Sequence, residues 1–231
     1  MMAGSEESWG QAAAWYPDIV AIGDACGAWQ AEFDRQAMSV RVRPREIGGP
    51  RTATVENGKL HADLTLSPWK RGFYLALRRS RRTMLQGFAS DLAVASGAVW
   101  GWLSGARPGA VASAWPFLGS VALAEARERG DRVESAWFWL YENHCDDPVA
   151  TRLRAFVSLA LQKRRLRSLL PYTSHWALSF SATAEWPFSG NYPIVVPAET
   201  PDRYVVRTRD GHVHEETDAG GALRLVLADI R

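Results

Sequence analysis

The chain has 231 residues, of which 47% are hydrophobic and 23% charged, an ordinary composition for one large globular domain or two small ones. Lysine and arginine number 27 against 25 for aspartate and glutamate, and a net charge of +2 gives no general attraction for nucleic acid. No segment is apolar enough to cross a membrane, and the N-terminus lacks the pattern of a signal peptide. We therefore expect a soluble, cytoplasmic protein that binds neither nucleic acid nor a membrane.

Several enzyme classes are disfavoured by motifs that the sequence lacks. Two cysteines, Cys26 and Cys145, cannot build a disulfide framework or a zinc site based on CxxC pairs. The phosphate-binding, dinucleotide-binding, serine-hydrolase and zinc-protease motifs do not occur either. We expect no cofactor and no bound metal.

The first half of the chain predicts mainly β structure. After a partly ordered lead-in over residues 1–23, the pattern predicts a helix that Asp24 begins and a strand at 39–43. Alternating residues on both sides of Asn57-Gly58 predict a hairpin over 52–66, because this pair tolerates the positive φ of a tight turn. A second pair of strands is predicted at 72–78 and 83–89.

The middle of the chain predicts helices. Ser90 is expected to cap the first, which Gly105 ends, and a short helix starts at Pro108. Helical periodicity returns over 121–130 and 131–143. The longest helix is expected to begin at Pro148 and to run toward Leu169, with Pro171 ending it.

The last third returns to β structure. Residues 175–182 alternate as a strand, residues 203–208 and 212–216 predict a hairpin around Asp210-Gly211, and Thr217 or Asp218 caps a final helix. This order favours an α+β fold with a predominantly antiparallel sheet, a central run of helices and strands in both the N- and C-terminal parts. We expect a single domain over 24–231, with a candidate boundary near 105–120; the sequence leaves open whether the two β regions share one sheet.

The candidate catalytic residues gather where the longest helix meets the following strand. His175 could act as an acid/base group with Tyr172 or Ser174 as its partner, and Glu185, among aromatic residues, is a reserve. The alternative is that these hydroxyl and imidazole groups satisfy backbone atoms at a helix exit. The catalytic interpretation requires that this corner face a sheltered hollow.

Three further polar patterns have simple structural alternatives. Asp91 could be a general base at the positive end of a helix dipole, but an aspartate there is more typical of a residue that stabilises the helix start. His212 and His214, with Glu216 on the same face, have the spacing of a metal site but also of an exposed edge strand. The run 144–147 mixes histidine, cysteine and aspartate ligands, but it has no second half of a metal site, so we expect a helix cap.

Aromatic and basic residues supply the candidate binding groups. Two arginine-rich stretches contain no carboxylate, so each could receive an anionic ligand or be neutralised by acids elsewhere. These stretches comprise Lys70, Arg71, Arg78, Arg79, Arg81 and Arg82, and then Arg152, Arg154, Lys163, Arg164, Arg165 and Arg167. The candidate substrate-binding residues are Trp102, Trp139, Trp176, Trp186, Phe188, Arg79 and Arg167.

Several short motifs carry a family resemblance. They lie at 86–92, 102–105, 115–117, 167–176, 178–181, 186–189 and 203–206. In these motifs the chain resembles a bacterial, chiefly actinobacterial, family of unknown function whose members are labelled natural product biosynthesis proteins. The resemblance implies an α+β fold and a setting in secondary metabolism, and it carries over no catalytic residue. The aromatic run 137–139 and the basic turn 78–82 depart from the family pattern.

Two functions are compatible with these features. The first is a natural product biosynthesis enzyme, a cofactor-free cyclase, dehydratase or isomerase that encloses a small-molecule or peptide intermediate in a Trp-lined pocket. The alternative is a non-enzymatic binding protein, either an accessory or adaptor protein or an immunity factor, that recognises an acidic partner or leader peptide through its arginines. A homodimer is left open for either function.

Overall fold

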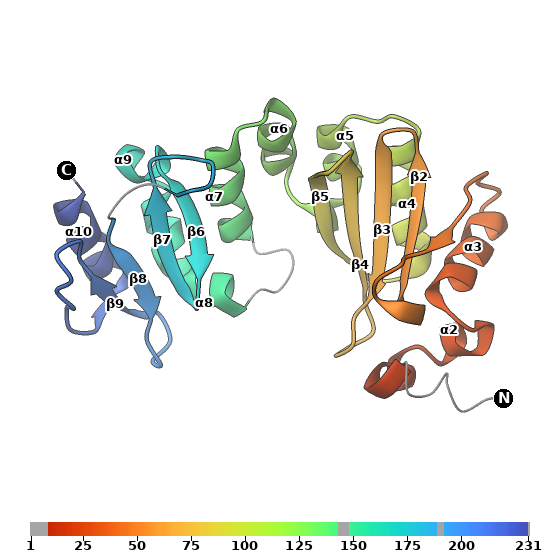
Figure 1. Ribbon diagram of the computed structural model, residues 1–231, viewed down its shortest axis with the longest axis horizontal. Helices are drawn as coiled ribbons and strands as arrows, with labels where there is room; N and C mark the ends of the chain where they lie inside the picture. The colour runs from red at the N-terminus through yellow and green to blue at the C-terminus, as the bar shows by residue number, and fades with distance from the viewer. Residues whose placement is uncertain (1–8, 143–147, 189–191, 231) are drawn as a thin grey trace. The chain divides into compact units, whose positions relative to one another are not determined.

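The computed structural model describes residues 9–142, 148–188 and 192–230, and the chain divides into two compact units, Met1–Ala124 and Glu125–Arg231 (Figure 1). Each unit contains a five-stranded antiparallel sheet within the described residues. The predicted α+β class is therefore confirmed, and the two β regions form two sheets. The division falls after the boundary that the sequence suggested. No helix among the described residues is long and apolar enough to span a membrane.

The N-terminal sheet is a meander in which each strand pairs with the next. Its strands are β1 (Arg43–Pro44), β2 (Thr52–Asn57), β3 (Leu60–Leu66), β4 (Phe73–Arg79) and β5 (Arg82–Ala89). The hairpin predicted over 52–66 is confirmed, since Asn57 pairs with Leu60 and Gly58 has a φ of 61°. The strand predicted at 39–43 is wrong in its bounds, because regular pairing begins only at Arg43.

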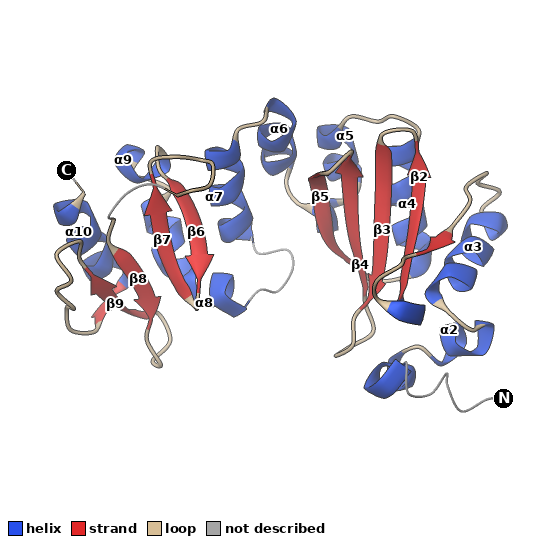
Figure 2. Cartoon of the chain, viewed as in Figure 1, coloured by secondary structure: helices blue, strands red, loops and turns tan. Residues whose placement is uncertain are grey.

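Helices of the N-terminal unit cover one face of its sheet (Figure 2). The helical segments are η1 (Gly10–Trp15), α2 (Pro17–Ile22), α3 (Ala25–Arg35), η2 (Gly49–Arg51), α4 (Leu92–Leu103), α5 (Pro108–Ala114), η3 (Pro116–Leu118) and α6 (Val121–Arg129), the last of which crosses the division between the units. The predicted cap of α3 is confirmed, because Asp24 Oδ1 accepts a hydrogen bond from Gly27 N at 2.7 Å. Asp91, and not the predicted Ser90, caps α4 by accepting from Val94 N at 2.8 Å.

Tyr16 joins the N-terminal helices to the loop between β3 and β4. Its buried hydroxyl lies 2.7 Å from Gly72 O and 3.1 Å from Ser67 O, and Gly72 N donates to it at 2.9 Å. Burial raises the pKa of this phenol, although the hydrogen bonds at Gly72 and Ser67 partly oppose that shift. One side chain thus satisfies the Ser67 carbonyl and the Gly72 amide of this loop, while the Gly72 carbonyl also accepts from Ser67 N at 3.0 Å.

We predict that Tyr16→Phe destabilises the protein by about 1–3 kcal/mol at neutral pH, because it leaves buried backbone groups without a partner. The raised pKa means that the neutral phenol stabilises the fold below the unfolded value of about 10, and that this contribution is lost as the pH rises through the folded value. Urea unfolding at pH 7 and at alkaline pH measures both effects. If Tyr16→Phe loses as much stability as the unmodified chain when the pH is raised, ionisation of Tyr16 does not cause that loss.

The C-terminal unit packs helices against a second sheet, whose strand order is β10-β9-β8-β7-β6. α7 and α10 both contact α8, and each of these three helices contacts the sheet. The elements are α7 (Arg132–Glu142), α8 (Pro148–Ala160), α9 (Arg164–Arg167), β6 (Leu170–Ser174), β7 (Ala177–Ser181), β8 (Ile194–Pro197), β9 (Arg203–Arg207), β10 (Thr217–Asp218) and α10 (Ala219–Asp229). The cap predicted for the last helix is confirmed as Asp218, which accepts from Gly221 N.

Two sequence predictions in this unit are wrong at their boundaries. The long helix ends at Ala160, and Pro171 lies within strand β6 instead of ending a helix. Proline is tolerated there because β6 is at the edge of the sheet, where a missing N–H costs no pairing. Residues 212–216 form no regular strand, and Val213 makes only an isolated bridge with Arg207.

Candidate functional site

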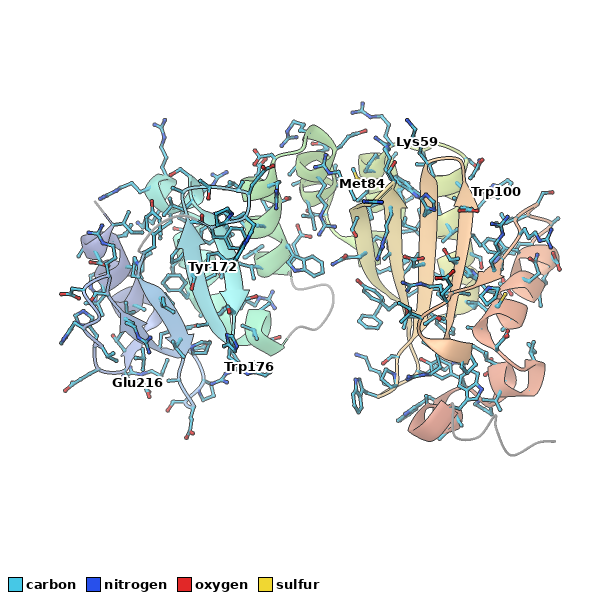
Figure 3. All side chains as sticks on the ribbon, viewed as in Figure 1. Lys59, Met84, Trp100, Tyr172, Trp176 and Glu216 are labelled. Atoms are coloured by element: carbon cyan, nitrogen blue, oxygen red, sulfur yellow. The ribbon has the colours of Figure 1, made fainter. Side chains whose placement is uncertain are left out.

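His175 and Trp176 form the two-residue turn between β6 and β7. Their φ angles are 47° and 69°, the left-handed values of a tight hairpin turn. The strand predicted to begin at His175 therefore begins at Ala177. Both side chains are exposed, Trp176 to 60%, and Ser174 Oγ lies 3.0 Å from His175 Nδ1. The turn is a hairpin tip, at which Figure 3 labels Trp176, and the exposed His175 side chain has there none of the shelter that the catalytic interpretation requires.

The four candidate catalytic residues are not gathered at one point. The pairing of Leu170 with Ser181 puts the loop that follows β7 at the opposite end of the hairpin from His175. Glu185, in that loop, is 84% exposed, and its carboxylate lies 3.5 Å from the Arg132 guanidinium. Tyr172 lies within β6, nearer the middle of the sheet than Trp176 (Figure 3). The structure brings together Ser174 and His175, and separately Tyr172 and the loop after β7.

Three aromatic side chains meet on the face of the sheet that carries Tyr172. The ring centroids of Tyr172 and Phe188 are 4.6 Å apart, and those of Phe188 and Trp186 are 5.6 Å apart at 72°. Trp186 is 83% exposed, whereas Tyr172 and Phe188 are half-buried. We call Tyr172, Trp186 and Phe188 the aromatic cluster. Edge-to-face and offset contacts of this kind stabilise the rings beyond the area that they bury.

Hydrogen bonds hold the loop that presents Trp186. The buried Ser181 Oγ accepts from Thr183 N at 3.1 Å and donates to Thr183 O at 2.7 Å. Thr183 Oγ1 in turn lies 3.3 Å from Glu185 O and 3.4 Å from Pro187 O. The two hydroxyls replace regular strand pairing in this proline-containing segment, so the exposed indole is carried on an ordered loop.

A surface cavity of about 470 Å³ lies where α7 begins and α9 ends. A second cavity, of about 30 Å³, shares Glu134 and Arg167 with it and reaches Trp137, Phe138 and Leu161. We call the larger cavity the α7–α9 pocket. It is lined by Asp131, Val133, Glu134, Gln162, Arg164, Arg167 and Ser168.

Charged groups on the two walls of the α7–α9 pocket are unequally paired. The Glu134 carboxylate lies 2.6 Å from the Arg129 guanidinium, whereas its distance to the Arg167 guanidinium is longer, at 3.8 Å. Asp131 caps α7 by accepting from Glu134 N at 2.9 Å. The Arg164 side chain has no hydrogen bond or ion pair with any described residue. Arg167, a predicted substrate-binding residue, lines this pocket, as does Arg164 from the same arginine-rich stretch; the other lining residues were not predicted as binding groups.

The candidate binding residues of the N-terminal unit have structural roles there. Trp102 is fully buried, and its indole N–H donates to His61 O at 3.1 Å. The Arg79 guanidinium lies 5.7 Å from the Trp102 ring centroid. The interpretation of Trp102 as a wall of an open pocket is therefore wrong, because its side chain is buried in the core. Trp139, in the C-terminal unit, lies 5.3 Å from the guanidinium of Arg127.

Several members of the two arginine-rich stretches are engaged by carboxylates or by backbone carbonyls elsewhere in the chain. Arg71 makes a two-pronged pair with Asp18 at 2.7 and 2.8 Å, and Arg78 lies 3.2 Å from the buried Asp63. Arg152 and Arg165 donate to backbone carbonyls. The sequence could not show these contacts, because their members are not neighbours along the chain.

The histidine pattern near the C-terminus does not assemble a metal site. The rings of His212 and His214 are 4.6 Å apart, while Glu216 pairs with Arg203 at 3.3 Å. No group of three or more metal-ligating side chains occurs within residues 9–142, 148–188 and 192–230. The run 144–147 lies outside the described residues.

Comparison with known proteins gives a family match for the C-terminal unit alone. Neither the curated proteins nor the solved structures contain a significant match to the chain. Residues 131–230, which include the aromatic cluster and the α7–α9 pocket, match the model described as "Family of unknown function (DUF6193)".

Proposed function

We propose that the C-terminal unit is a non-enzymatic binding module that recognises an acidic peptide segment of a partner. The observation that carries this proposal is Trp186, whose indole is almost fully exposed yet is held on an ordered loop beside Phe188. Tryptophan and arginine are the residues that most often dominate binding energy at interfaces. A loop whose backbone is already held by hydrogen bonds loses less conformational entropy on association than an unconstrained one.

The basic residues of α9 indicate the charge of the partner. α9 and the residue before it contribute four cations, Lys163, Arg164, Arg165 and Arg167. Neither Lys163 nor Arg164 has a carboxylate partner among the described residues. Complementary charge accelerates association and selects the partner, so an acidic segment with apolar residues fits this surface. In the secondary-metabolite setting that the resemblance implies, such a segment is a leader peptide or an acidic biosynthetic protein.

The enzyme alternative has less support from the geometry. An acid/base residue needs a bound substrate within hydrogen-bond distance and shelter from water, whereas His175 and Glu185 are exposed at different ends of the hairpin. The contact between Ser174 and His175 is local to the turn and leaves Tyr172 beside Phe188.

The proposal is tested by titrating the full chain with a fluorescein-labelled synthetic peptide that alternates glutamate with leucine and phenylalanine. We expect Trp186→Ala to weaken binding at least about tenfold, the effect of losing an interface hot spot. Trp69→Ala is the matched control, because Trp69 is 79% exposed but belongs to the N-terminal unit. Equal affinities of the two variants, or no saturable binding by the unmodified chain, would refute the proposal.

His175→Asn separates the binding function from the enzymatic one. Asparagine tolerates the left-handed conformation of this turn and removes the acid/base group. We expect peptide affinity and melting temperature to stay close to those of the unmodified chain, since exposed substitutions change stability by about 0.5 kcal/mol or less. A loss of peptide binding in this variant with its melting temperature unchanged would instead place the site at the hairpin tip.

A further inference from the structure

We infer that the α7–α9 pocket is the subsite for a carboxylate of the acidic segment, held by Arg164 and Arg167. This inference rests on the proposed function and assigns the ligand of one part of the binding surface. Most polar groups of the pocket are already engaged by the protein. Ser168 Oγ donates to Arg165 O at 2.9 Å, and Asp131 accepts from the backbone of α7. The Arg164 guanidinium is the group that remains without a described partner.

Arg167 is available to a ligand as well. Its nitrogen lies 3.8 Å from Glu134, whereas Glu134 is already bound by Arg129 at 2.6 Å. A hydrogen-bonded arginine–carboxylate pair has N···O distances of about 2.7–2.9 Å. The longer contact with Glu134 therefore leaves the N–H donors of Arg167 able to bind a ligand. A carboxylate that enters the pocket can therefore bind Arg167 while Glu134 keeps its main partner.

Acidic residues balance the arginines of the pocket. Asp131 and Glu134 line the same cavity as Arg164 and Arg167, so the formal charges of the four groups cancel, and a second negative charge on a ligand gains no net attraction there. A carboxylate carries one negative charge, whereas a phosphate monoester carries about 1.5–2 at neutral pH. Val133 lines the pocket, and Phe138 and Leu161 line the small cavity beside it, which suits the methylene groups of a glutamate side chain.

The pocket and the aromatic cluster are linked through α7. Val133 lines the pocket, and the preceding residue, Arg132, pairs with Glu185 in the loop that carries Trp186. The same loop begins after Ser181, which pairs with Leu170 at the start of β6. Leu170 is two residues after Ser168, which lines the pocket. The pair between Arg132 and Glu185 thus joins the start of α7, which lines the pocket, to the loop that carries Trp186.

The test is an NMR titration of the full chain with acetylated tetraglutamate amide, observed at the arginine Nε–Hε resonances. We expect saturable shifts for Arg164 and Arg167, and a loss of affinity of at least about fivefold in Arg164→Gln and in Arg167→Gln. Arg154→Gln is the matched control, because Arg154 is an exposed arginine of the same unit and its substitution removes the same charge. We expect it to change the affinity less than about twofold, as an exposed and screened charge should.

The outcomes separate this inference from the proposed function. Equal loss in all three arginine variants would show a general charge effect and overturn the subsite. Inorganic phosphate binding at Arg164 and Arg167 more tightly than tetraglutamate would overturn the assignment of a carboxylate. Binding of the mixed glutamate–leucine–phenylalanine peptide that depends on Trp186 but not on these arginines would refute the subsite alone. Arginine-dependent tetraglutamate binding without any effect of Trp186→Ala would refute the proposed peptide surface alone.

Discussion

Gly87→Ala should destabilise the N-terminal unit more than any conservative change in its sheet. A Cβ atom at this position would lie 1.7 Å from the Phe117 carbonyl oxygen and 2.8 Å from its carbon. Both are backbone atoms of η3, so the movement of a flexible side chain cannot relieve this clash. Gly87 pairs with Leu75 in the middle of β5, where the strand itself is held in register. Glycine is required here because another backbone approaches the sheet at contact distance.

We expect Gly87→Ala to cost about 3 kcal/mol or more, at or above the upper end of overpacking substitutions. Urea unfolding followed by circular dichroism measures this loss. Gly72→Ala is the control, because its Cβ would lie 3.7 Å from a Phe88 ring atom, an ordinary contact. Similar losses of stability in both variants would contradict the close packing of η3 on β5.

Trp137→Ala should have a comparable effect on the C-terminal unit. The indole is buried, its N–H donates to Leu169 O at 3.0 Å, and its ring lies 6.0 Å from that of Phe180. Truncation of a buried tryptophan removes packing and leaves a cavity, at a cost of about 3–5 kcal/mol. The freed Leu169 carbonyl lies beside Ser168, so we also expect the α7–α9 pocket to lose its shape.

Two further variants separate packing from hydrogen bonding at this position. Trp137→Phe keeps most of the packing but leaves the Leu169 carbonyl unpaired, for which we expect about 1–3 kcal/mol. Trp139→Ala, on the same helix but only half-buried, should cost less than Trp137→Ala. Thermal unfolding of the three variants gives the order, and a larger loss for Trp139→Ala would contradict the assignment of Trp137 to the core.

Local chemistry explains which parts of the fold the sequence predicts. The hairpin around Asn57-Gly58 and the cap at Asp24 depend on neighbouring residues, and both are confirmed. The prediction that Pro171 ends a helix is wrong because a proline is tolerated in β6 only at the edge of a sheet, and the position of a strand at the edge is a property of the assembled sheet. The tight turn at His175-Trp176 was missed because neither residue favours positive φ, and pairing on both sides imposes it.

The candidate site was partly visible for the same reason. Composition and family resemblance drew attention to Tyr172, Trp186 and Phe188, although not to their mutual contact. The α7–α9 pocket depends on Glu134 and Arg167, which are far apart in sequence and meet only when α7 packs beside α9. The unequal pairing of its charges has no signal in the sequence.

We expect the aromatic cluster and the α7–α9 pocket, and not the hairpin tip at His175, to form the binding surface of the C-terminal unit. This expectation is tested most directly by following the indole N–H resonances of the full chain, assigned by single Trp→Phe variants, during titration with the mixed glutamate–leucine–phenylalanine peptide. We predict a saturable shift of the Trp186 resonance, with the Trp176 and Trp69 resonances unchanged. A response confined to Trp176, beside His175, with no change at Trp186 would contradict the account.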